Sequence, residues 1–271
     1  MPVITSRQHP LIKQLIKLEK SSQYRKKANL TVLDGIHLIQ IYSSVLGTPK
    51  HLVVSQSYID DTANKRFISM LFGGALAKVI VISNALFQEI SPVKTPTGIL
   101  ALIAIPDLAP DVNNKRETFS VLLEAIQDPG NLGSILRSAA AANVRDIYLS
   151  PQCADAWSPK TLRAAMGAHF FLRIHENSDL QSIAAQFPGT VIATSIQASK
   201  NLFEISLAGS IAFVFGNEGA GLSKEIISAC DENIAIHMPG NTESLNAAAA
   251  AAICFFEKVR QDSTNAASGK I

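Results

Sequence analysis

Short apolar runs alternate with longer amphipathic stretches along the second half of the chain. The runs lie at residues 121–126, 147–150, 171–174, 191–195, 211–216 and 234–238. Runs of this length are typical of buried strands, and their alternation with helical patterns predicts a mostly parallel sheet covered on both faces. Ligands of such sheets bind beyond the carboxyl ends of the strands. We therefore expect a site in the loops that follow these runs.

The first half has a different and smaller pattern. Strands are expected at residues 51–55, 78–82 and 98–105, and helices around residues 35–46 and 84–90. Pro106, Pro110 and a polar run then separate the two halves as a linker would. The predicted divisions are residues 1–105, a linker at 106–117, a second domain at 118–260 and a disordered tail at 261–271.

Charge is distributed unevenly between the halves. Residues 1–116 hold 14 Lys and Arg against 7 Asp and Glu, a net +7, whereas residues 117–271 hold 10 against 15, a net −5. Lys13, Lys17 and Lys20 recur at helical spacing opposite three leucines, and a basic loop at residues 25–27 is expected to follow. The stripe is typical either of a solvated amphipathic helix or of a surface that neutralises nucleic-acid phosphates, and the pattern alone leaves both open.

Several classes of protein are disfavoured. With 47% hydrophobic residues the chain has ample material for buried cores. Its longest apolar stretch, residues 247–256, is too short to cross a bilayer, and residues 1–14 hold no signal core, so we expect a cytoplasmic protein without a membrane partner. The three cysteines form no metal-type spacing, so no metal is expected. Neither a dinucleotide glycine fingerprint nor a phosphate-loop motif is present.

The first polar segment with candidate chemistry is residues 128–133 (DPGNLG), which follows one apolar run. Asn131 fits the N-cap of the helix expected next. Arg137 falls opposite the apolar stripe of that helix, together with Ser134 and Ser138, so its guanidinium is offered to a cleft or a partner. A capped strand–helix loop with a surface arginine would explain the same residues.

The second segment, residues 216–221 (GNEGAG), ends another apolar run and holds three glycines in six residues. Glycines allow unusual backbone angles and the close approach of a ligand. Glu218 would repel a phosphate, so a neutral or cationic ligand or an arginine is a better companion. A flexible turn before a helix at residues 223–229 is the alternative.

The third segment leads from a turn at residues 239–242 through Ser244, Leu245 and Asn246 into an alanine-rich helix reaching Lys258. Small side chains let backbones pack closely, which suits a tight internal crossing or a subunit contact. Helix propensity alone explains the alanines, but it does not explain the serine and asparagine that precede them.

In their order and residues, the three segments resemble the motifs of the SpoU (TrmH-like) branch of the SPOUT superfamily, which methylates ribose 2′-hydroxyls of RNA using S-adenosylmethionine. The resemblance covers about residues 120–258. A looser one covers residues 1–105, where 5–13, 24–27 and 33–39 resemble the L30e-like substrate-binding domain of such proteins. Asp34 stands where relatives commonly carry Glu, and Ala247 and Ala248 stand where they often carry Val-Ser.

The resemblance implies a fold class and a partner. The expected fold is α/β, with a carboxyl-terminal SPOUT domain that contains a deep trefoil knot and a small L30e-like α/β domain before it. An obligate homodimer, whose interface contributes to both sites, is also implied. Knots are so rare that the pattern of residues would not have suggested one.

The resemblance also implies site residues, carried over motif by motif. Catalytic roles fall on Asn131, Arg137, Glu218, Ser244 and Asn246. S-adenosylmethionine is expected against Thr194, Ser195, Gly216, Asn217, Gly219, Ile236, Met238 and Leu245. RNA contacts are expected from Arg7, Lys13, Lys17, Arg25, Lys26 and Lys27.

The implied reaction is an in-line attack of a ribose oxygen on a sulfonium methyl, which needs alignment and removal of a proton but no metal. Arg137 is the family's base or base partner, yet a guanidinium keeps its proton at neutral pH. We therefore expect Arg137 to hold the adjacent phosphate and stabilise the developing alkoxide. Asn131, Ser244 and Asn246 would orient the ribose and Arg137, and Glu218 would position a basic group of the same or the partner subunit.

Substrate choice is less constrained than the reaction. The amino-terminal domain favours ribosomal RNA by analogy. Three alternatives stay open at this point: a tRNA 2′-O-methyltransferase, a non-catalytic RNA-binding regulator that retains the fold, and a nicotinamide-dependent α/β enzyme, which the missing glycine fingerprint disfavours.

Overall fold

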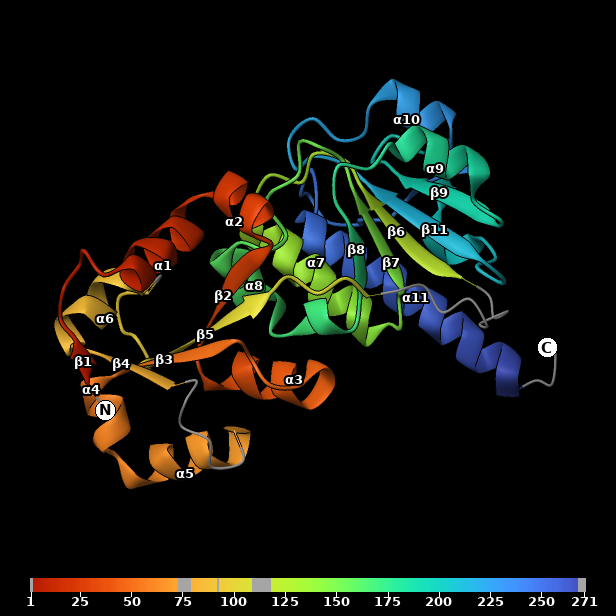
Figure 1. Ribbon diagram of the computed structural model, residues 1–271. Coiled ribbons are helices and arrows are strands. Elements are labelled where there is room, and N and C mark those ends of the chain that lie inside the picture. Colours follow the sequence, from red (N-terminus) through yellow and green to blue (C-terminus); the bar gives the residue numbers. More distant parts are fainter. Residues whose placement is uncertain (1, 73–78, 92, 109–117, 268–271) are drawn as a thin grey trace. The chain divides into compact units, whose positions relative to one another are not determined.

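The chain folds into two compact units, shown in Figure 1. The computed structural model describes residues 2–72, 79–91, 93–108 and 118–267. One unit holds the described residues up to Asp107 together with Trp157–Phe170, and the other holds the remaining described residues. Most of the predicted linker and the last four residues of the predicted tail lie outside the described part of the chain.

The first unit is built on a five-stranded mixed sheet in the order β1-β4-β3-β5-β2. Its strands are β1 (Val3–Ile4), β2 (Leu30–Asp34), β3 (His51–Ser55), β4 (Val79–Ile82) and β5 (Ile99–Ala104). Its helices from the first half of the chain are α1 (Pro10–Lys20), α2 (Ser22–Ala28), α3 (Ile36–Leu46), α4 (Gln56–Asp60), α5 (Thr62–Phe72) and α6 (Asn84–Ile90). The predicted strands and helices of this half are all present, but β1, β2, α2, α4 and α5 were not predicted.

Helix α1 shows how the basic stripe is presented. Its N-cap His9 accepts a hydrogen bond from the backbone of Leu11, and Pro10 begins the helix. Ile12, Leu15 and Leu18 are buried in the core of this unit. Because apolar residues at this spacing share one face, the lysines between them remain exposed on the other.

The predicted basic loop at residues 25–27 is wrong, because these residues belong to α2. The side chain of Arg25 is 4% exposed, and its guanidinium donates to the carbonyl oxygens of Leu18 and Glu19 at the end of α1. A helix end leaves such carbonyls without partners, and a buried arginine can satisfy several of them. The expected RNA contact of Arg25 is therefore corrected: this side chain joins two helices and does not lie on the surface.

A segment from the second half of the sequence completes the first unit. It contains α8 (Pro159–Ala165) and the short helix η2 (Ala168–Phe170). The hydroxyl of Thr31 donates to the carbonyl of Trp157 at 2.7 Å, and the ring of Tyr42 meets that of Phe170 edge-on at 5.3 Å. Contacts with β2 and α3 therefore hold a segment that lies well beyond the linker in the sequence.

Replacing Gly167 with alanine should test this packing. Gly167 has a φ of +90°, and a Cβ there would lie 2.8 Å from Cδ1 of Ile41 on α3. Gly47 has the same φ, but nothing lies within 4 Å of its added Cβ. Backbone strain of about 1–3 kcal/mol is common to both substitutions, so Gly167→Ala should lose more unfolding free energy in urea than Gly47→Ala. Equal losses would contradict the packing of this segment against α3.

The second unit contains a fully parallel seven-stranded sheet in the order β10-β12-β9-β11-β6-β7-β8. Its strands are β6 (Phe119–Leu123), β7 (Asp146–Leu149), β8 (Arg173–His175), β9 (Thr190–Thr194), β10 (Lys200–Asn201), β11 (Ile211–Phe215) and β12 (Glu232–Ala235). This confirms the predicted parallel sheet. Each of the six apolar runs overlaps one strand, and only the two-residue β10 was not predicted.

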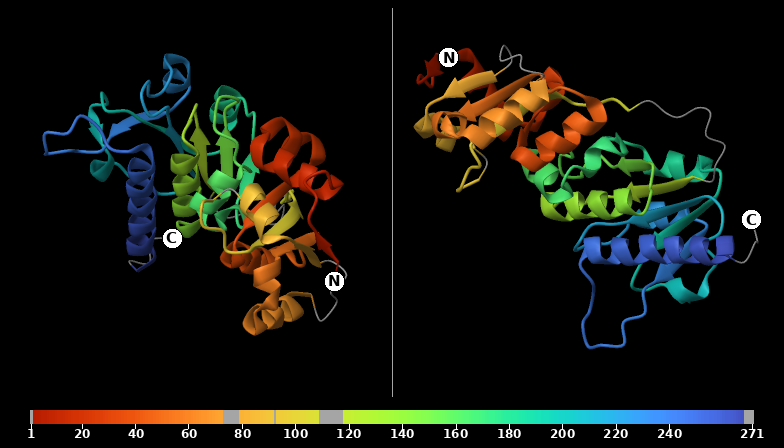
Figure 2. Two further views of the ribbon diagram at one scale, coloured as in Figure 1. Left: turned by 90° about the vertical axis from the view of Figure 1, so that its left-hand side faces the viewer. Right: turned by 90° about the horizontal axis from the view of Figure 1, so that it is seen from below.

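Helices cover both faces of this sheet, as predicted. They are α7 (Pro129–Ala141), α9 (Leu180–Gln186), α10 (Lys224–Ser228) and α11 (Ala247–Ala267), with a short helix η3 (Leu202–Glu204) after β10. Figures 1 and 2 show α7 beside α11 on one face and α9 beside α10 on the other. Phe255 of α11 packs against the rings of Phe119, Phe213 and Phe215.

Helix α11 continues to Ala267, so the prediction of disorder from residue 261 is wrong for the described part of the tail. Gln261 ties this end of the helix to residues 205–207. Its side chain accepts from the backbone of Leu207 at 2.8 Å and donates to the carbonyl of Ile205 at 3.1 Å. Lys258 also pairs with Asp262 one turn later. Among the described residues, no helix has both the length and the hydrophobicity needed to cross a membrane.

Replacing Gln261 with alanine should lower the unfolding free energy by about 1–3 kcal/mol, because it leaves the N–H of Leu207 and the carbonyl of Ile205 without this partner. Chemical denaturation followed by circular dichroism measures the effect. Ser263→Ala is the matched control, since that hydroxyl only bonds back to Val259 in the same helix. A similar loss of unfolding free energy in both variants would show that the hydrogen bonds from Gln261 to residues 205 and 207 do not stabilise the fold.

Candidate active site

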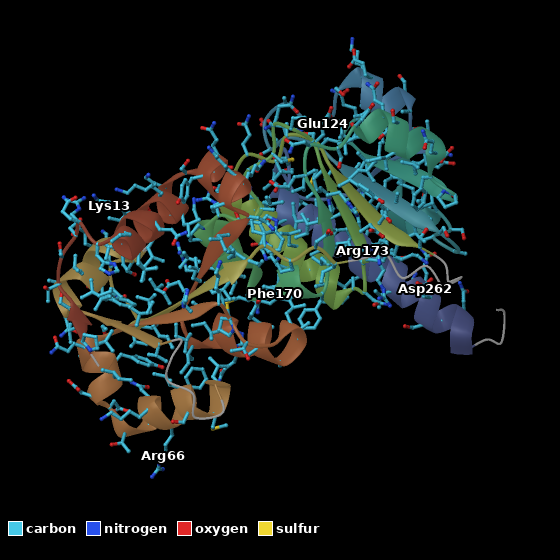
Figure 3. The ribbon with its side chains drawn as sticks, in the orientation of Figure 1. Lys13, Arg66, Glu124, Phe170, Arg173 and Asp262 are labelled. Carbon is cyan, nitrogen blue, oxygen red and sulfur yellow. The ribbon has the colours of Figure 1, made fainter. Side chains whose placement is uncertain are left out.

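The order of the strands brings the predicted segments together. From β6 the chain adds β7 and β8 on one side, whereas β11, β9 and β12 lie on the other side. The switch point of the sheet therefore lies between β6 and β11, where α/β folds bind their ligands. The first segment follows β6 and the second follows β11. Figure 3 labels Glu124 at this carboxyl edge of the sheet.

Two side-chain hydrogen bonds join all three segments. Nδ2 of Asn246 donates to Oδ1 of Asn131 at 2.9 Å, and Nδ2 of Asn131 donates to Oε1 of Glu218 at 3.0 Å. The amide of Asn131 is therefore fixed in orientation by an acceptor on one side and a donor on the other. The predicted convergence of the segments is confirmed, while the catalytic roles of these residues stay predictions.

Glu218 contacts the first segment in a way that sequence reasoning missed. Its carboxylate accepts from the backbone N–H groups of Gln127 and Asp128, both at 3.3 Å, in addition to Asn131. Burial raises the pKa of Glu218, but the hydrogen bonds from Asn131 and from backbone N–H groups outweigh it, so this pKa lies below its usual value. Within the described chain, an ionised Glu218 thus fastens one loop to another, and N–H groups take the place of the expected basic side chain.

The predicted N-cap of α7 is wrong by three residues. Asp128 caps the helix, with its Oδ1 accepting from the backbone of Asn131 at 2.8 Å, and Pro129 occupies the first helical position. Proline at that position favours the preceding aspartate as cap, a signal present in the sequence. Because Asp128 supplies the cap, the side chain of Asn131 is available for Glu218 and Asn246.

The second segment is an ordered loop. Asn217 donates to the carbonyl of Ala125 at 2.8 Å and accepts from the backbone of Gly219 and Ala220. The backbones of Asn217 and Gly221 pair with each other. A Cβ on Gly216 would lie 2.3 Å from the carbonyl carbon of Gly221, so glycine is required there by close backbone packing. These bonds favour a shaped loop over the flexible turn that was the alternative.

In the third segment Asn246 has two roles. Its Oδ1 accepts from the backbone of Ala248 and Ala249 at the start of α11, while its Nδ2 reaches Asn131. Ser244 is exposed, and Leu245 is 38% exposed although apolar. The capping bond therefore fixes Asn246, and its two predecessors are left accessible at the same edge of the sheet.

Arg137 lies exposed on α7, on the side opposite the buried Leu132, Ile135 and Leu136. Among the residues that the structure describes, its guanidinium has no hydrogen-bond or ion-pair partner. A charged group held on a helix without an internal partner is available to an external anion.

The residues expected to hold the cofactor follow three neighbouring strands. Thr194 is the last residue of β9 and Ser195 follows it, Gly216 follows β11, and Ile236 and Met238 follow β12. The hydroxyl of Thr194 donates to the carbonyl of Val214 at 2.9 Å, which ties β9 to β11 near the ends of both strands. These positions share one edge of the sheet because their strands are adjacent and parallel.

Glu124 and Ser223 form a pair that sequence reasoning missed. The carboxylate of Glu124 accepts from the backbone of Ser223 at 2.8 Å and from its hydroxyl at 2.7 Å. This bond holds the start of α10 against the end of β6. A charged residue inside the apolar run at residues 121–126 was the available signal.

The expected RNA-contacting residues belong to the first unit. Lys13 and Lys17 are exposed on α1, and Lys26 and Lys27 are exposed on α2. Arg7 is exposed and pairs with Glu89 at 2.7 Å. Together with Lys20 the four lysines form what we call the α1–α2 basic surface. Figure 3 shows Lys13 at one end of this unit and Arg66 of α5 at another.

The described residues contain no candidate metal site. No three His, Cys, Asp or Glu side chains are grouped there as a metal site would need, and the three cysteines are free thiols. Burial raises the pKa of Cys230 to about 11, so this thiol is a poor nucleophile.

Both halves of the chain match known families. Residues 118–256 match the SpoU rRNA Methylase family, and residues 9–101 match the MRM3-like substrate binding domain. The two matches fall on either side of the predicted linker.

Two relatives match over nearly the whole length of the chain. The chain is 31% identical to "Uncharacterized tRNA/rRNA methyltransferase slr1673" of Synechocystis, over 95% of this chain and 93% of that protein. It is 31% identical to "23S rRNA (guanosine(2553)-2′-O)-methyltransferase RlmP" of Bacillus subtilis, over 94% of this chain and 98% of that protein. The crystal structure of the SpoU methyltransferase AviRb from Streptomyces viridochromogenes is similar with a TM-score of 0.79 and 25% identity, covering 93% and 97% of the two chains. The same enzyme in complex with AdoMet is similar with a TM-score of 0.80.

Proposed function

This chain belongs to the SpoU rRNA methylase family, and we propose that it transfers a methyl group from S-adenosylmethionine to a ribose 2′-hydroxyl of ribosomal RNA. The observation that carries the proposal is the chain of hydrogen bonds from Asn246 through Asn131 to Glu218, which assembles three distant segments at one sheet edge. The Bacillus subtilis relative, a 23S rRNA 2′-O-methyltransferase by name, supports the choice of ribosomal RNA.

The residues at the ends of β9, β11 and β12 suit the cofactor. When bound, S-adenosylmethionine supplies a methyl group that is already activated by its sulfonium. The loops offer backbone N–H and carbonyl groups for a neutral adenosine, and half-exposed Leu245 offers apolar surface. We assign Thr194 through its backbone, because its hydroxyl already bonds Val214. The other cofactor positions are Ser195, Gly216, Asn217, Gly219, Ile236 and Met238.

The proposed catalytic side chains bind the RNA phosphate, orient the ribose and hold the loops in place. Arg137 is exposed and permanently charged, so it holds an RNA phosphate and stabilises the negative charge that develops on the ribose oxygen. Ser244 and Asn246 orient the ribose from the start of α11. Glu218 acts through Asn131, because its carboxylate keeps that amide and the loop before α7 in place.

A homodimer and a trefoil knot complete the proposal. Both rest chiefly on the family, but exposed apolar side chains support the dimer. Phe256 is 48% exposed on α11, close along the chain to the alanine-rich start of this helix. Sedimentation equilibrium should give about twice the 29.0 kDa of one chain. A mass of one chain at micromolar concentration would count against the dimer.

The α1–α2 basic surface should bind the RNA backbone. Reversing two charges with Lys13→Glu and Lys17→Glu should weaken binding to ribosomal RNA at least tenfold and reduce the salt slope by about 2. Binding measured at several KCl concentrations gives both quantities. Lys65→Glu with Arg66→Glu on α5 changes the charge equally at a distant site of the same unit. If both double variants weakened RNA binding equally, the effect would come from the net charge of the unit and not from the α1–α2 basic surface.

Mapping of 2′-O-methyl groups tests the reaction itself. Ribosomal and transfer RNA from cells with and without this gene are compared, and the gene is then restored as wild type or as Arg137→Ala. We expect one ribosomal position to lose its methyl group and to regain it only with the wild type. No loss in either RNA, or a loss confined to transfer RNA, would contradict the proposal.

A further inference from the structure

A cavity that none of the predicted site residues lines opens at the carboxyl ends of β6, β7 and β8. Its volume is about 310 Å³, close to the lower limit of about 300 Å³ for ligand pockets. The polar side chains that line it belong to Glu124, Ser150, Asn177, Ser178, Asp179 and Gln181. Leu180 and Ile226 add apolar surface. All of these residues belong to the second unit.

One residue connects this cavity to the methyl-transfer site. The N–H of Ala125 donates to the hydroxyl of Ser150 in the cavity wall at 2.9 Å, and its carbonyl accepts from Asn217 in the second segment. Ala125 adopts a φ of +54°, which is unfavourable for alanine, so the surrounding bonds must hold it there. The cavity therefore adjoins the switch point of the sheet, on the face covered by α9 and α10.

The fixed groups in the cavity accept hydrogen bonds. Ser223 holds both oxygens of Glu124, and Ser182 holds both oxygens of Asp179. Each carboxylate oxygen has a further lone pair to offer. Two carboxylates repel a phosphate, but they attract N–H donors. The cavity thus suits a ligand with apolar faces and N–H groups along one edge.

Among the four RNA bases, guanine alone carries two adjacent N–H donors, N1–H and the 2-amino group, on its Watson–Crick edge. Uracil, cytosine and adenine each place an acceptor beside their donor, which a carboxylate would repel. Unpaired nucleotides expose this edge. We propose that the cavity receives the guanine base of the nucleotide whose ribose is methylated, with Glu124 accepting from N1–H and the 2-amino group. This inference rests on the proposed function.

Nucleoside binding to the full-length protein tests the cavity directly. Guanosine, inosine, adenosine and uridine are titrated by saturation-transfer NMR. Guanosine should bind at least tenfold more tightly than the others, including inosine, which lacks only the 2-amino group. Glu124→Gln should weaken guanosine binding at least tenfold, because the new amide opposes donors with donors. Equal affinity for the four nucleosides would overturn the inference, and so would an unchanged guanosine affinity in Glu124→Gln.

A second variant covers the case in which Glu124→Gln destabilises α10 through the loss of its bonds to Ser223. Gln181 is exposed on the first turn of α9, and its side chain has no hydrogen bond to the described residues, so Gln181→Trp should fill the mouth of the cavity without unfolding the chain. Guanosine binding should be lost, with the melting temperature and the affinity for S-adenosylhomocysteine unchanged. Retained guanosine binding would place the nucleoside elsewhere.

The mapping experiment separates the two proposals. A methyl group lost from a guanosine of ribosomal RNA supports both. A loss from uridine, adenosine or cytidine would overturn the guanine cavity and leave methyl transfer standing. If no methyl group is lost, the proposed function fails, and the nucleoside titration still decides whether the cavity selects guanine.

Discussion

Arg137→Ala is expected to lower the kcat/KM of methyl transfer by about 10²–10³-fold, the range for removing one group that stabilises charge in a transition state. The fold should not change, because Arg137 is exposed and alanine is a better helix former. Affinity for S-adenosylhomocysteine should also be nearly unchanged, since the expected cofactor residues follow β9, β11 and β12. Transfer of a labelled methyl group to unmodified ribosomal RNA measures the first effect, and calorimetry measures the second.

Two further variants sharpen this prediction. Arg145→Ala removes another exposed arginine of the same unit, directly before β7 at the opposite edge of the sheet, and should stay within about twofold of the wild type. Arg137→Lys keeps the charge but loses the planar fork, so its activity should lie between those of the wild type and the alanine variant. Full activity of Arg137→Ala would rule out the role assigned to this side chain.

The architecture of the second unit was predictable because its strands are buried on both faces. Such strands read as continuous apolar runs, as Ile211–Phe215 does, and they stand out from amphipathic helices. Strand β10 has two residues and no apolar signal, so no pattern in the sequence could have shown it. The order of the strands, which creates the switch point, depends on long-range packing that periodicity does not contain.

Errors arose where tertiary contacts override local composition. Arg25, next to two lysines, looks like a surface residue, yet it satisfies carbonyls at the end of α1. Residues 261–267 are polar, yet Gln261 bonds residues more than fifty positions earlier in the chain. In both cases a hydrogen-bonding requirement of another element decided the structure, and nothing near the residue in the sequence indicated it.

The site was predictable in its parts but not in its connections. The three segments and their exposed polar residues follow from strand ends and from family resemblance. The bonds that fix them, from Glu218 to the backbone of residues 127 and 128 and from Glu124 to Ser223, join positions about a hundred residues apart. Whether a carboxylate faces an arginine or a row of N–H groups depends on loop geometry, which residue identity does not show.

Glu218→Gln is expected to reduce kcat/KM about 100-fold, although the two side chains have nearly the same shape. Glu218 accepts from the backbone of Gln127 and Asp128 and from the amide of Asn131. Glutamine keeps one acceptor oxygen and replaces the other with an NH2 group. At least one of the three hydrogen bonds is therefore lost, and the NH2 group faces an N–H donor of the first segment. A hydrogen bond to a charged group contributes about 1.5–3 kcal/mol, which corresponds to roughly 10–100-fold when the loop must be ordered for reaction.

The pH dependence of stability distinguishes this role from simple charge removal. Because the pKa of Glu218 lies below its usual value of 4.5 in the folded chain, its ionised form stabilises the fold fully above that value. The advantage of the wild type over Glu218→Gln should therefore be complete at pH 7 and should disappear as the pH falls below about 4.5 through the lowered pKa. Glu225→Gln, an exposed carboxylate on α10, should show neither the activity loss nor the pH-dependent difference. If Glu218→Gln matched Glu225→Gln in both measurements, the bonds to the first segment would not be what orders the site.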